Sequence, residues 1–180
     1  MEGRVFFRRE TKEFLSLLPF TPTLAQTRAM EEIAADLSSG KPMNRLVQGD
    51  VGSGKTAVAA GAQTAMMAPT EILAHQHFET LTKLLSPARI VVGLLTGSMK
   101  AAEKRSVCAA LARGDIHLIV GTHALLSEGV EYQDLGLVIT DEQHRFGVGQ
   151  RSALSSKAKT PPHVLVMSAT PIPRTLALLI

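Results

Sequence analysis

Short apolar runs alternate with longer stretches of helical periodicity along this chain. The apolar runs predict strands over residues 45–48, 64–67, 89–94, 116–120, 135–140 and 164–167. Between these runs, apolar positions at helical spacing predict helices over residues 23–37, 71–85 and 99–113. Ser98 is the expected N-cap of the last helix, and Gly114 is its expected C-cap. The pattern is therefore one of strands and helices in alternation.

The predicted strands lack the period-2 alternation of apolar and polar residues that marks a half-exposed sheet. Continuous apolar runs are typical of strands buried on both faces, as in a parallel sheet covered by helices. The sequence therefore predicts an α/β fold without internal repeats or a low-complexity linker. Residues 10–18 predict a further helix that ends before Pro19, within an N-terminal extension over residues 1–19.

Composition narrows the class of protein. A chain of 180 residues with 45% hydrophobic content is long enough for one domain with a sizeable core. The sequence contains a single cysteine, Cys108, which excludes a disulfide scaffold and fits a reducing compartment. No apolar run approaches the roughly 20 residues that cross a bilayer, and charged residues near the N-terminus exclude a signal peptide. We therefore expect a soluble, cytoplasmic protein.

The charge of the chain permits nucleic-acid binding without predicting it. The net charge of +3 comes from 19 basic and 16 acidic residues, a thin excess, although the pI is near 9.2. Aromatic residues make up only 4% of the chain, which argues against a platform for stacking single-stranded bases. Composition alone therefore leaves the function open.

Residues 49–56 match the phosphate-binding pattern G-x-x-x-x-G-K-[ST] at every fixed position, after a predicted strand and at the start of a predicted helix. The glycines allow successive backbone N–H groups to surround an anion, and the helix dipole adds positive charge. Lys55 would contact the β- and γ-phosphates, and the Thr56 hydroxyl would ligate Mg²⁺. The alternative is a glycine-rich turn with a chance Gly-Lys-Thr sequence. The predicted nucleotide-binding residues of this loop are Gly49, Asp50, Val51, Gly52, Ser53, Gly54, Lys55 and Thr56.

An acidic pair follows another predicted strand. Asp141 and Glu142 come directly after the apolar run at residues 135–140. Asp141 is placed to hold Mg²⁺ through its water shell, and Glu142 is placed to act as general base toward an attacking water. The alternative is that the two acids cap a following helix. Together with the phosphate loop, the pair predicts a catalytic nucleotide site in which Lys55, Asp141 and Glu142 carry the chemistry.

The sequence Asp141-Glu142-Gln143-His144 resembles the DEAD/DExH box of superfamily 2 helicases, and other motifs follow in that family's order. The resemblance covers about residues 20–175. It implies a RecA-like P-loop NTPase fold, a three-layer sandwich of a mostly parallel sheet with helices on both faces. It also implies an ATP-dependent helicase that binds ATP and Mg²⁺. Residues 20–26 look like a Q motif, in which Gln26 is expected to read the adenine edge.

The remaining motifs imply two further groups of residues. Residues 168–170 match motif III, which links the nucleotide state to domain movement. The implied coupling residues are Gln143, His144, Ser168, Ala169 and Thr170. Three strand-to-helix turns look like motifs that contact the DNA backbone, where N–H and hydroxyl donors suit phosphate oxygens. The implied DNA-binding residues are Pro69, Thr70, Glu71, Thr96, Gly97, Ser98, Gly121, Thr122, His123 and Arg145. Each turn alone is a common structural feature and Arg145 equally fits a solvated loop, but the collinear order favours the functional interpretation.

Two longer stretches narrow the resemblance to one family. Residues 141–148, Asp-Glu-Gln-His-Arg-Phe-Gly-Val, and residues 169–175, Ala-Thr-Pro-Ile-Pro-Arg-Thr, resemble the bacterial RecG family. Members of that family are double-stranded DNA translocases that regress stalled forks and migrate branched junctions in recombination and repair. The transcription-repair coupling translocase is the alternative within this class. Gln143 favours the RecG family, since the coupling translocase usually has glutamate there.

The resemblance assigns residues 20–180 to the first RecA-like domain of such a motor. The second RecA-like domain, which contributes an arginine finger, and the wedge domain that grips junctions lie outside this sequence. The implied partners are these two domains of a parent chain and branched double-stranded DNA, which is bound through its backbone. We therefore expect this chain by itself to bind ATP and Mg²⁺ weakly and to hydrolyse ATP very slowly.

The stretch between the first two predicted strands is short for a crossover. After the phosphate loop, at most about ten residues remain for a helix, near 15 Å at 1.5 Å per residue. A parallel crossover needs at least about 10–12 residues besides the loop. We therefore hypothesise that a segment has been lost between about Ala60 and Gln63.

Two other classes of function are open to this sequence. One is a non-catalytic module that binds nucleotide or DNA, against which the intact Lys55, Thr56, Asp141 and Glu142 argue. The other is a small-molecule kinase, in which the motifs after residue 67 would have no role.

Two histidines at positions 75 and 77 raise the question of a metal site. They do not share a helical face, and no cysteine or third histidine completes a zinc set. We therefore interpret His75 and His77 as structural or exposed.

Overall fold

The structure is a computed structural model that describes residues 23–48, 62–141 and 153–168. Its helices are α2 (Leu24–Leu37), α3 (Glu71–Leu85) and α4 (Ala101–Arg113), with short 3-10 turns at Ser86–Ala88 and His123–Leu126. Its strands are β1 (Asn44–Gln48), β2 (Gln63–Met67), β3 (Val92–Leu95), β4 (Leu118–Gly121), β5 (Leu135–Asp141) and β6 (His163–Ser168). Each helix and strand that the hydrophobic pattern predicts within these residues is present, with ends shifted by a few positions at most. The helix predicted over residues 10–18 lies outside the described residues.

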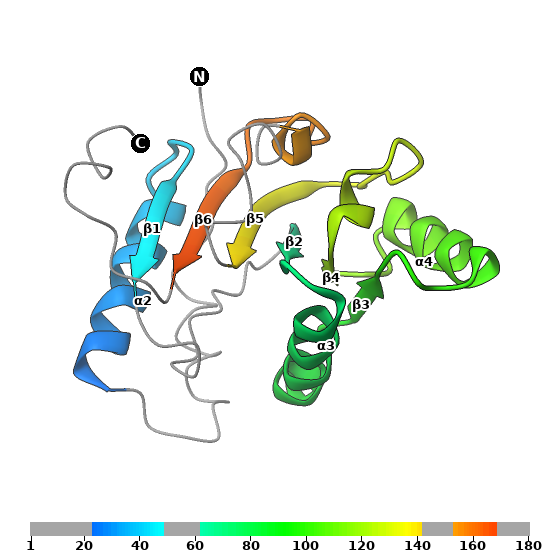
Figure 1. The fold of residues 1–180 in the computed structure, drawn as a ribbon. Coiled ribbons are helices and arrows are strands. Elements are labelled where there is room, and N and C mark those ends of the chain that lie inside the picture. The colour runs from blue at the N-terminus through cyan, green and yellow to red at the C-terminus, as the bar shows by residue number, and fades with distance from the viewer. Residues whose placement is uncertain (1–22, 49–61, 142–152, 169–180) are drawn as a thin grey trace.

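The strands form one parallel sheet in the order β1-β6-β5-β2-β4-β3 (Figure 1). Because the strands are parallel, all of them begin at one end of the sheet and finish at the other. We call these the amino end and the carboxyl end. The carboxyl end is formed by Gln48, Met67, Leu95, Gly121, Asp141 and Ser168. Ligand sites of open α/β sheets gather at this end.

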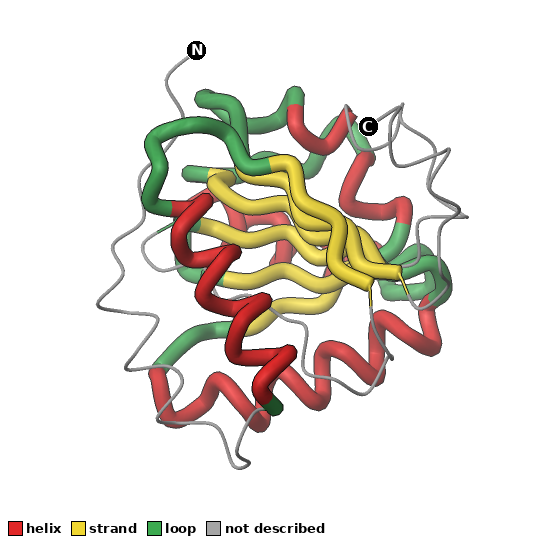
Figure 2. The backbone as a smooth tube through the Cα atoms, turned by 90° about the vertical axis from the view of Figure 1, so that its left-hand side faces the viewer, coloured by secondary structure: helices red, strands yellow, loops and turns green. Residues whose placement is uncertain are grey.

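Helices cover both faces of the sheet (Figure 2). Strands β2, β4 and β5 are buried along their whole length, which confirms the prediction from their continuous apolar runs. Because neighbouring residues of a strand point to opposite faces, the core divides into two clusters. One cluster joins α2 and α3 to the sheet through Ile33, Leu37, Ala74, Leu81, Leu85, Met66 and Ile139. The other joins α4 to the opposite face through Leu111, Met67, Ile119 and Val138.

Helix α4 begins later than predicted. Its N-cap is Lys100, with φ −62° and ψ 147°, and not Ser98. Ser98 instead belongs to the preceding turn, where its backbone N–H donates to Glu71 Oε1 at 3.0 Å. The helix ends as predicted at Gly114, whose φ of 84° is in the left-handed region that glycine adopts without strain.

Strand β3 also begins later than predicted, at Val92 and not at residue 89. Arg89 ends the short 3-10 turn with φ 57°, a left-handed conformation that interrupts an extended strand. The apolar pattern of the sequence carries no signal for this turn.

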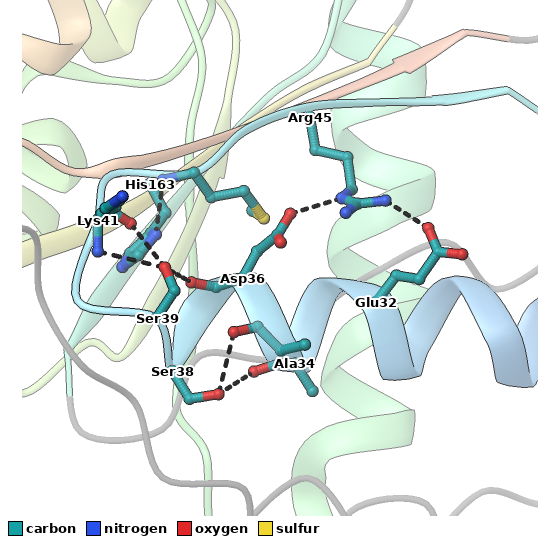
Figure 3. A network of polar contacts seen from close by, with 10 residues as sticks. Glu32, Ala34, Asp36, Ser38, Ser39, Lys41, Arg45 and His163 are labelled. Carbon is teal, nitrogen blue, oxygen red and sulfur yellow. Dashed lines mark hydrogen bonds and ion pairs between the residues drawn. The ribbon is translucent and has the colours of Figure 1, made fainter.

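An ion-pair network ties α2 to β1 near the amino end (Figure 3). Arg45 of β1 donates from Nη1 to Glu32 Oε2 at 2.6 Å and from Nε to Asp36 Oδ2 at 2.7 Å. The hydrogen bond to Asp36, followed by the one to Glu32, raises the pKa of the Arg45 guanidinium. In the same region the Met43 N–H donates to His163 Nδ1 at 3.0 Å, which connects the start of β1 to β6.

Within the described residues, no helix is both long enough and apolar enough to cross a bilayer.

Candidate functional site

The strand that leads into the phosphate-loop sequence and the strand that ends at Asp141 finish at the same end of the sheet. Strand β1, which leads into residues 49–56, and strand β5, which ends at Asp141, lie on either side of β6. Val47 of β1 and Asp141 of β5 both pair in register with Met167 of β6. Two strand spacings of about 4.8 Å place β1 and β5 roughly 10 Å apart. This is the arrangement that a shared nucleotide site requires.

Several predicted site residues lie outside the described residues. They are Gly49, Asp50, Val51, Gly52, Ser53, Gly54, Lys55, Thr56, Glu142, Gln143, His144, Arg145, Ala169 and Thr170. Ser168, the first residue of the predicted motif III, ends β6 and pairs in register with Gln48. Motif III therefore starts at the carboxyl end, between the strands that lead to the phosphate loop and to the acidic pair.

Asp141 is a nearly buried carboxylate at the carboxyl end of the sheet. It is 6% exposed and faces α3, where its Oδ2 lies 2.7 Å from His77 Nε2. An ionised carboxylate only accepts hydrogen bonds, so Nε2 of His77 is the donor. The side chains of His77 and Asp141 are 20% and 9% exposed, so this contact is largely shielded from water.

His77 is a candidate site residue that sequence reasoning missed. His75 is exposed, as expected, but His77 contacts the predicted metal ligand Asp141. The two residues are 64 positions apart in the sequence. Only the order of the strands, which sets β5 beside β2 and hence near α3, brings them together.

The oxygen donors predicted at this end suit Mg²⁺. A threonine hydroxyl and a carboxylate are hard ligands that Mg²⁺ accepts together with waters and substrate phosphates. Within the described ranges, no group of three or more His, Cys, Asp or Glu side chains forms a cage for a metal. Asp141 supplies a described carboxylate at this end, and carboxylate oxygen is a ligand that Mg²⁺ accepts.

Gln26 occupies the first turn of α2 and takes part in a capping box. Its backbone N–H donates to Thr23 Oγ1 at 3.3 Å, and its side-chain Oε1 accepts from the Thr23 N–H at 2.8 Å. These bonds satisfy orphan donors at the helix start. The predicted contact of Gln26 with adenine stays a prediction.

The turn at Gly97 and Ser98 is held by the two helices that flank it. Glu71 in the first turn of α3 accepts from the Ser98 N–H, and Lys104 Nζ of α4 donates to the Gly97 carbonyl oxygen at 2.5 Å. Hydrogen bonds from the Ser98 hydroxyl and then from its N–H lower the pKa of Glu71. Thr70 caps α3 by accepting from the Leu73 N–H at 3.3 Å. Glu71 therefore supports this turn, and its negative charge does not favour a direct contact with phosphate.

The predicted DNA-contacting residues differ in exposure. Gly97, Ser98 and His123 are exposed, whereas Thr96 and Thr122 are 0% and 8% exposed. Pro69 and Thr70 are partly exposed at the start of α3. Only the exposed and partly exposed members of this set can be reached by a ligand from solvent.

Position 121 is buried and requires glycine for a steric reason. A Cβ atom at this position would lie 2.2 Å from the carbonyl oxygen of Leu95 in the neighbouring strand. Glycine therefore allows β3 and β4 to approach each other at the carboxyl end.

Known proteins resemble this chain in sequence and in fold. Residues 23–179 match the DEAD/DEAH box helicase family. An ATP-dependent DNA helicase RecG of Streptococcus pneumoniae is 57% identical, over 89% of this chain and 25% of that protein. Another, of Aquifex aeolicus, is 54% identical, over 93% of this chain and 22% of that protein. A solved structure of RecG bound to a three-way DNA junction matches with a TM-score of 0.80 and 47% identity, over 98% of this chain and 25% of that one. This chain thus spans about a quarter of the length of these relatives.

The structural match confirms the predicted RecA-like P-loop NTPase fold, an α/β sandwich with a parallel sheet. The hypothesis of a segment lost between about Ala60 and Gln63 stays a prediction, because residues 49–61 lie outside the described residues.

Proposed function

The chain belongs to the DEAD/DEAH box helicase family, and from this premise we propose that it is the first ATPase domain of a RecG-type DNA motor. In this proposal, the parent protein is an ATP-dependent translocase and helicase on double-stranded DNA. It acts on branched DNA, regressing forks and migrating junctions in recombination and repair. The identities above 50% to RecG proteins support this motor over the coupling translocase.

The observation that carries the proposal is the common end of β1 and β5. A phosphate-loop sequence and an acidic pair form one site only if their strands finish together, and in this sheet they do, with β6 between them. A fold with these two stretches on opposite edges of the sheet, too far apart to share one ion, would have contradicted a nucleotide site.

Each predicted residue has a role in hydrolysis of ATP. Lys55 binds the β- and γ-phosphates, and Gln26 recognises the adenine edge. Thr56 and Asp141 hold Mg²⁺, Asp141 through a water molecule. When Mg²⁺ is bound, it supplies charge neutralisation on the phosphates. Glu142 orients the attacking water and accepts its proton.

The surface for DNA lies at the same end of the sheet. Gly97, Ser98 and His123 are exposed there, and phosphate oxygens, which carry no base information, are the partners that we propose for this surface. Contacts of this kind allow a motor to track duplex DNA of any sequence. We propose that the second RecA-like domain closes on this end and completes the ATP site, and that the wedge domain holds the junction.

ATP hydrolysis tests this function directly. We would assay a protein that contains this chain together with the second RecA-like and wedge domains, without DNA, with linear duplex, and with forked duplex of equal length. We expect forked DNA to stimulate hydrolysis most strongly. Equal rates under all three conditions would contradict a DNA motor, and equal stimulation by both duplexes would contradict only the preference for branched DNA.

A variant of the proposed base identifies the site that hydrolyses ATP. We expect Glu142→Gln to retain ATP binding and to lower the turnover rate by about 10²–10⁴-fold, because the amide cannot accept the proton. Glu79→Gln, on the exposed side of α3, is the matched control and should leave turnover unchanged. Unchanged turnover in Glu142→Gln would show that another group acts as base.

A further inference from the structure

The contact between His77 and Asp141 has no role in the chemistry described so far. His77 Nε2 donates to Asp141 Oδ2 at 2.7 Å, and both side chains are mostly withdrawn from water. Since solvent competes less for a shielded hydrogen bond, this contact restrains the carboxylate more than an exposed one would.

The helix that carries His77 is firmly anchored. Three residues of α3, Ala74, Leu81 and Leu85, are buried in the core that joins it to the sheet. At its start, Thr70 caps the helix with a side-chain hydrogen bond. A residue that orients a metal ligand is most effective on a rigid helix or strand, because a mobile element would let the ligand side chain rotate.

We propose that His77 is a positioning residue, which holds the Asp141 carboxylate in the orientation that binds hydrated Mg²⁺. The inference rests on the proposed function, in which Asp141 is a ligand of the Mg²⁺ that accompanies ATP. With Oδ2 engaged by His77, Oδ1 is the carboxylate oxygen that would accept from the waters of a bound Mg²⁺. Hydrogen bonds of this kind orient metal ligands throughout proteins, and their loss typically costs 10–100-fold in metal affinity or activity.

Two substitutions at position 77 separate the hydrogen bond from packing. His77→Phe keeps an aromatic ring of similar size and removes the donor. His77→Gln keeps an N–H donor on a side chain that reaches a similar distance. The matched control is His75→Ala, on the same helix but exposed and without a contact to Asp141.

The readout is the Mg²⁺ concentration that gives half-maximal binding of a fluorescent ATP analogue to a protein that contains this chain and the second RecA-like domain. We expect His77→Phe to raise this concentration by about 10–100-fold. His77→Gln should stay within a few-fold of the unmodified chain, and His75→Ala should equal it. Binding of the analogue in EDTA and the thermal unfolding midpoint should be alike in all four proteins, which excludes a merely structural role.

The results distinguish a failure of the positioning role from a failure of the nucleotide site. If His77→Phe is folded and has the Mg²⁺ dependence of the unmodified chain, the positioning role is overturned while the nucleotide site stands. The positioning role is also overturned if His77→Gln needs as much Mg²⁺ as His77→Phe, because a hydrogen-bond donor at position 77 then fails to restore Mg²⁺ binding. If the unmodified chain shows no Mg²⁺-dependent binding, the proposed function and this inference both fail.

Discussion

At the amino end of the sheet, Gln63 uses its whole amide group to hold other parts of the fold together. Its Nε2 donates to the carbonyl oxygens of Leu111 and Ile116, each at 2.8 Å, and its Oε1 accepts from the Asp134 N–H at 3.0 Å. At the carboxyl end, Asp141 is bound by His77 alone among the described residues. Other residues that are predicted to contact a ligand at this end, such as Ser98, are exposed to solvent.

The difference shows how one sheet separates stability from function. The Gln63 amide at the amino end is buried and satisfied within the fold, so its substitution removes internal hydrogen bonds and lowers stability. Polar groups at the carboxyl end retain oxygen and hydroxyl atoms that can face a ligand, so a substitution there changes binding first. Substitutions of similar size should therefore differ in effect: at the amino end they lower stability, and at the carboxyl end they change ligand binding first.

The largest effect on stability is expected from Gln63→Ala at the amino end. The change removes the donor to the Leu111 and Ile116 carbonyl oxygens and the acceptor of the Asp134 N–H, and Gln63 is 4% exposed. The Leu111 carbonyl oxygen keeps its hydrogen bond from the Gly114 N–H. Loss of a hydrogen bond to a buried group costs about 1–3 kcal/mol, so we expect a total loss of about 3 kcal/mol. Urea denaturation followed by circular dichroism measures it.

The control for this prediction is Gln76→Ala on α3, a glutamine that is exposed. We expect it to change the free energy of unfolding by less than about 0.5 kcal/mol. Equal losses in the two variants would show that the amide network of Gln63 contributes nothing specific.

A smaller effect, on ATP affinity, is expected from lengthening the connection between β1 and β2. Residues 49–62 run from the carboxyl end of β1 to the amino end of β2, and β6 and β5 lie between these strands. If this connection has lost a segment, inserting about ten helix-forming residues after Ala60 supplies the length of a normal crossover. We expect ATP affinity to rise about tenfold, which corresponds to 1.4 kcal/mol.

Calorimetric titration with ATP and Mg²⁺ measures this change. An inserted flexible Gly/Ser segment of the same length is the control, because it adds reach without adding a helix. An affinity that does not rise with the helical insert would argue that the present connection already serves the phosphate loop.

The smallest effect is expected from the pH dependence of the turn at Gly97 and Ser98. Hydrogen bonds from Ser98 lower the pKa of Glu71 from its ordinary value of 4.5. A pKa that is lower in the folded state means that ionised Glu71 stabilises the turn above pH 4.5. This contribution is lost as the pH falls further, through the lowered pKa. Because Glu71 is partly exposed, the effect on global stability is small.

The Ser98 amide resonance reports the titration of Glu71 by NMR. We expect its chemical shift to follow a single step below pH 4.5, and Glu71→Gln to remove that step. A step of equal size in the variant would assign the titration to another group.

Much of the fold was predictable from local patterns. The continuous apolar runs of β2, β4 and β5 indicated burial on both faces, because a half-exposed strand requires alternation. Gly114 was predictable as a cap because glycine adopts positive φ at little cost. The later starts of β3 and α4 were not, since they depend on the left-handed Arg89 and on the contact of Ser98 with Glu71.

The candidate site was predictable as motifs but not as a set of contacts. The sequence alone determined the phosphate-loop pattern, the acidic pair at Asp141 and the parallel α/β class, because each depends on residue types at fixed local spacing. Tertiary structure alone decided the strand order that brings β1 and β5 together, the burial of Thr96 and Thr122, and the approach of His77 to Asp141. The physical reason is that these features arise from packing between segments far apart in the chain, which no local pattern of side chains encodes.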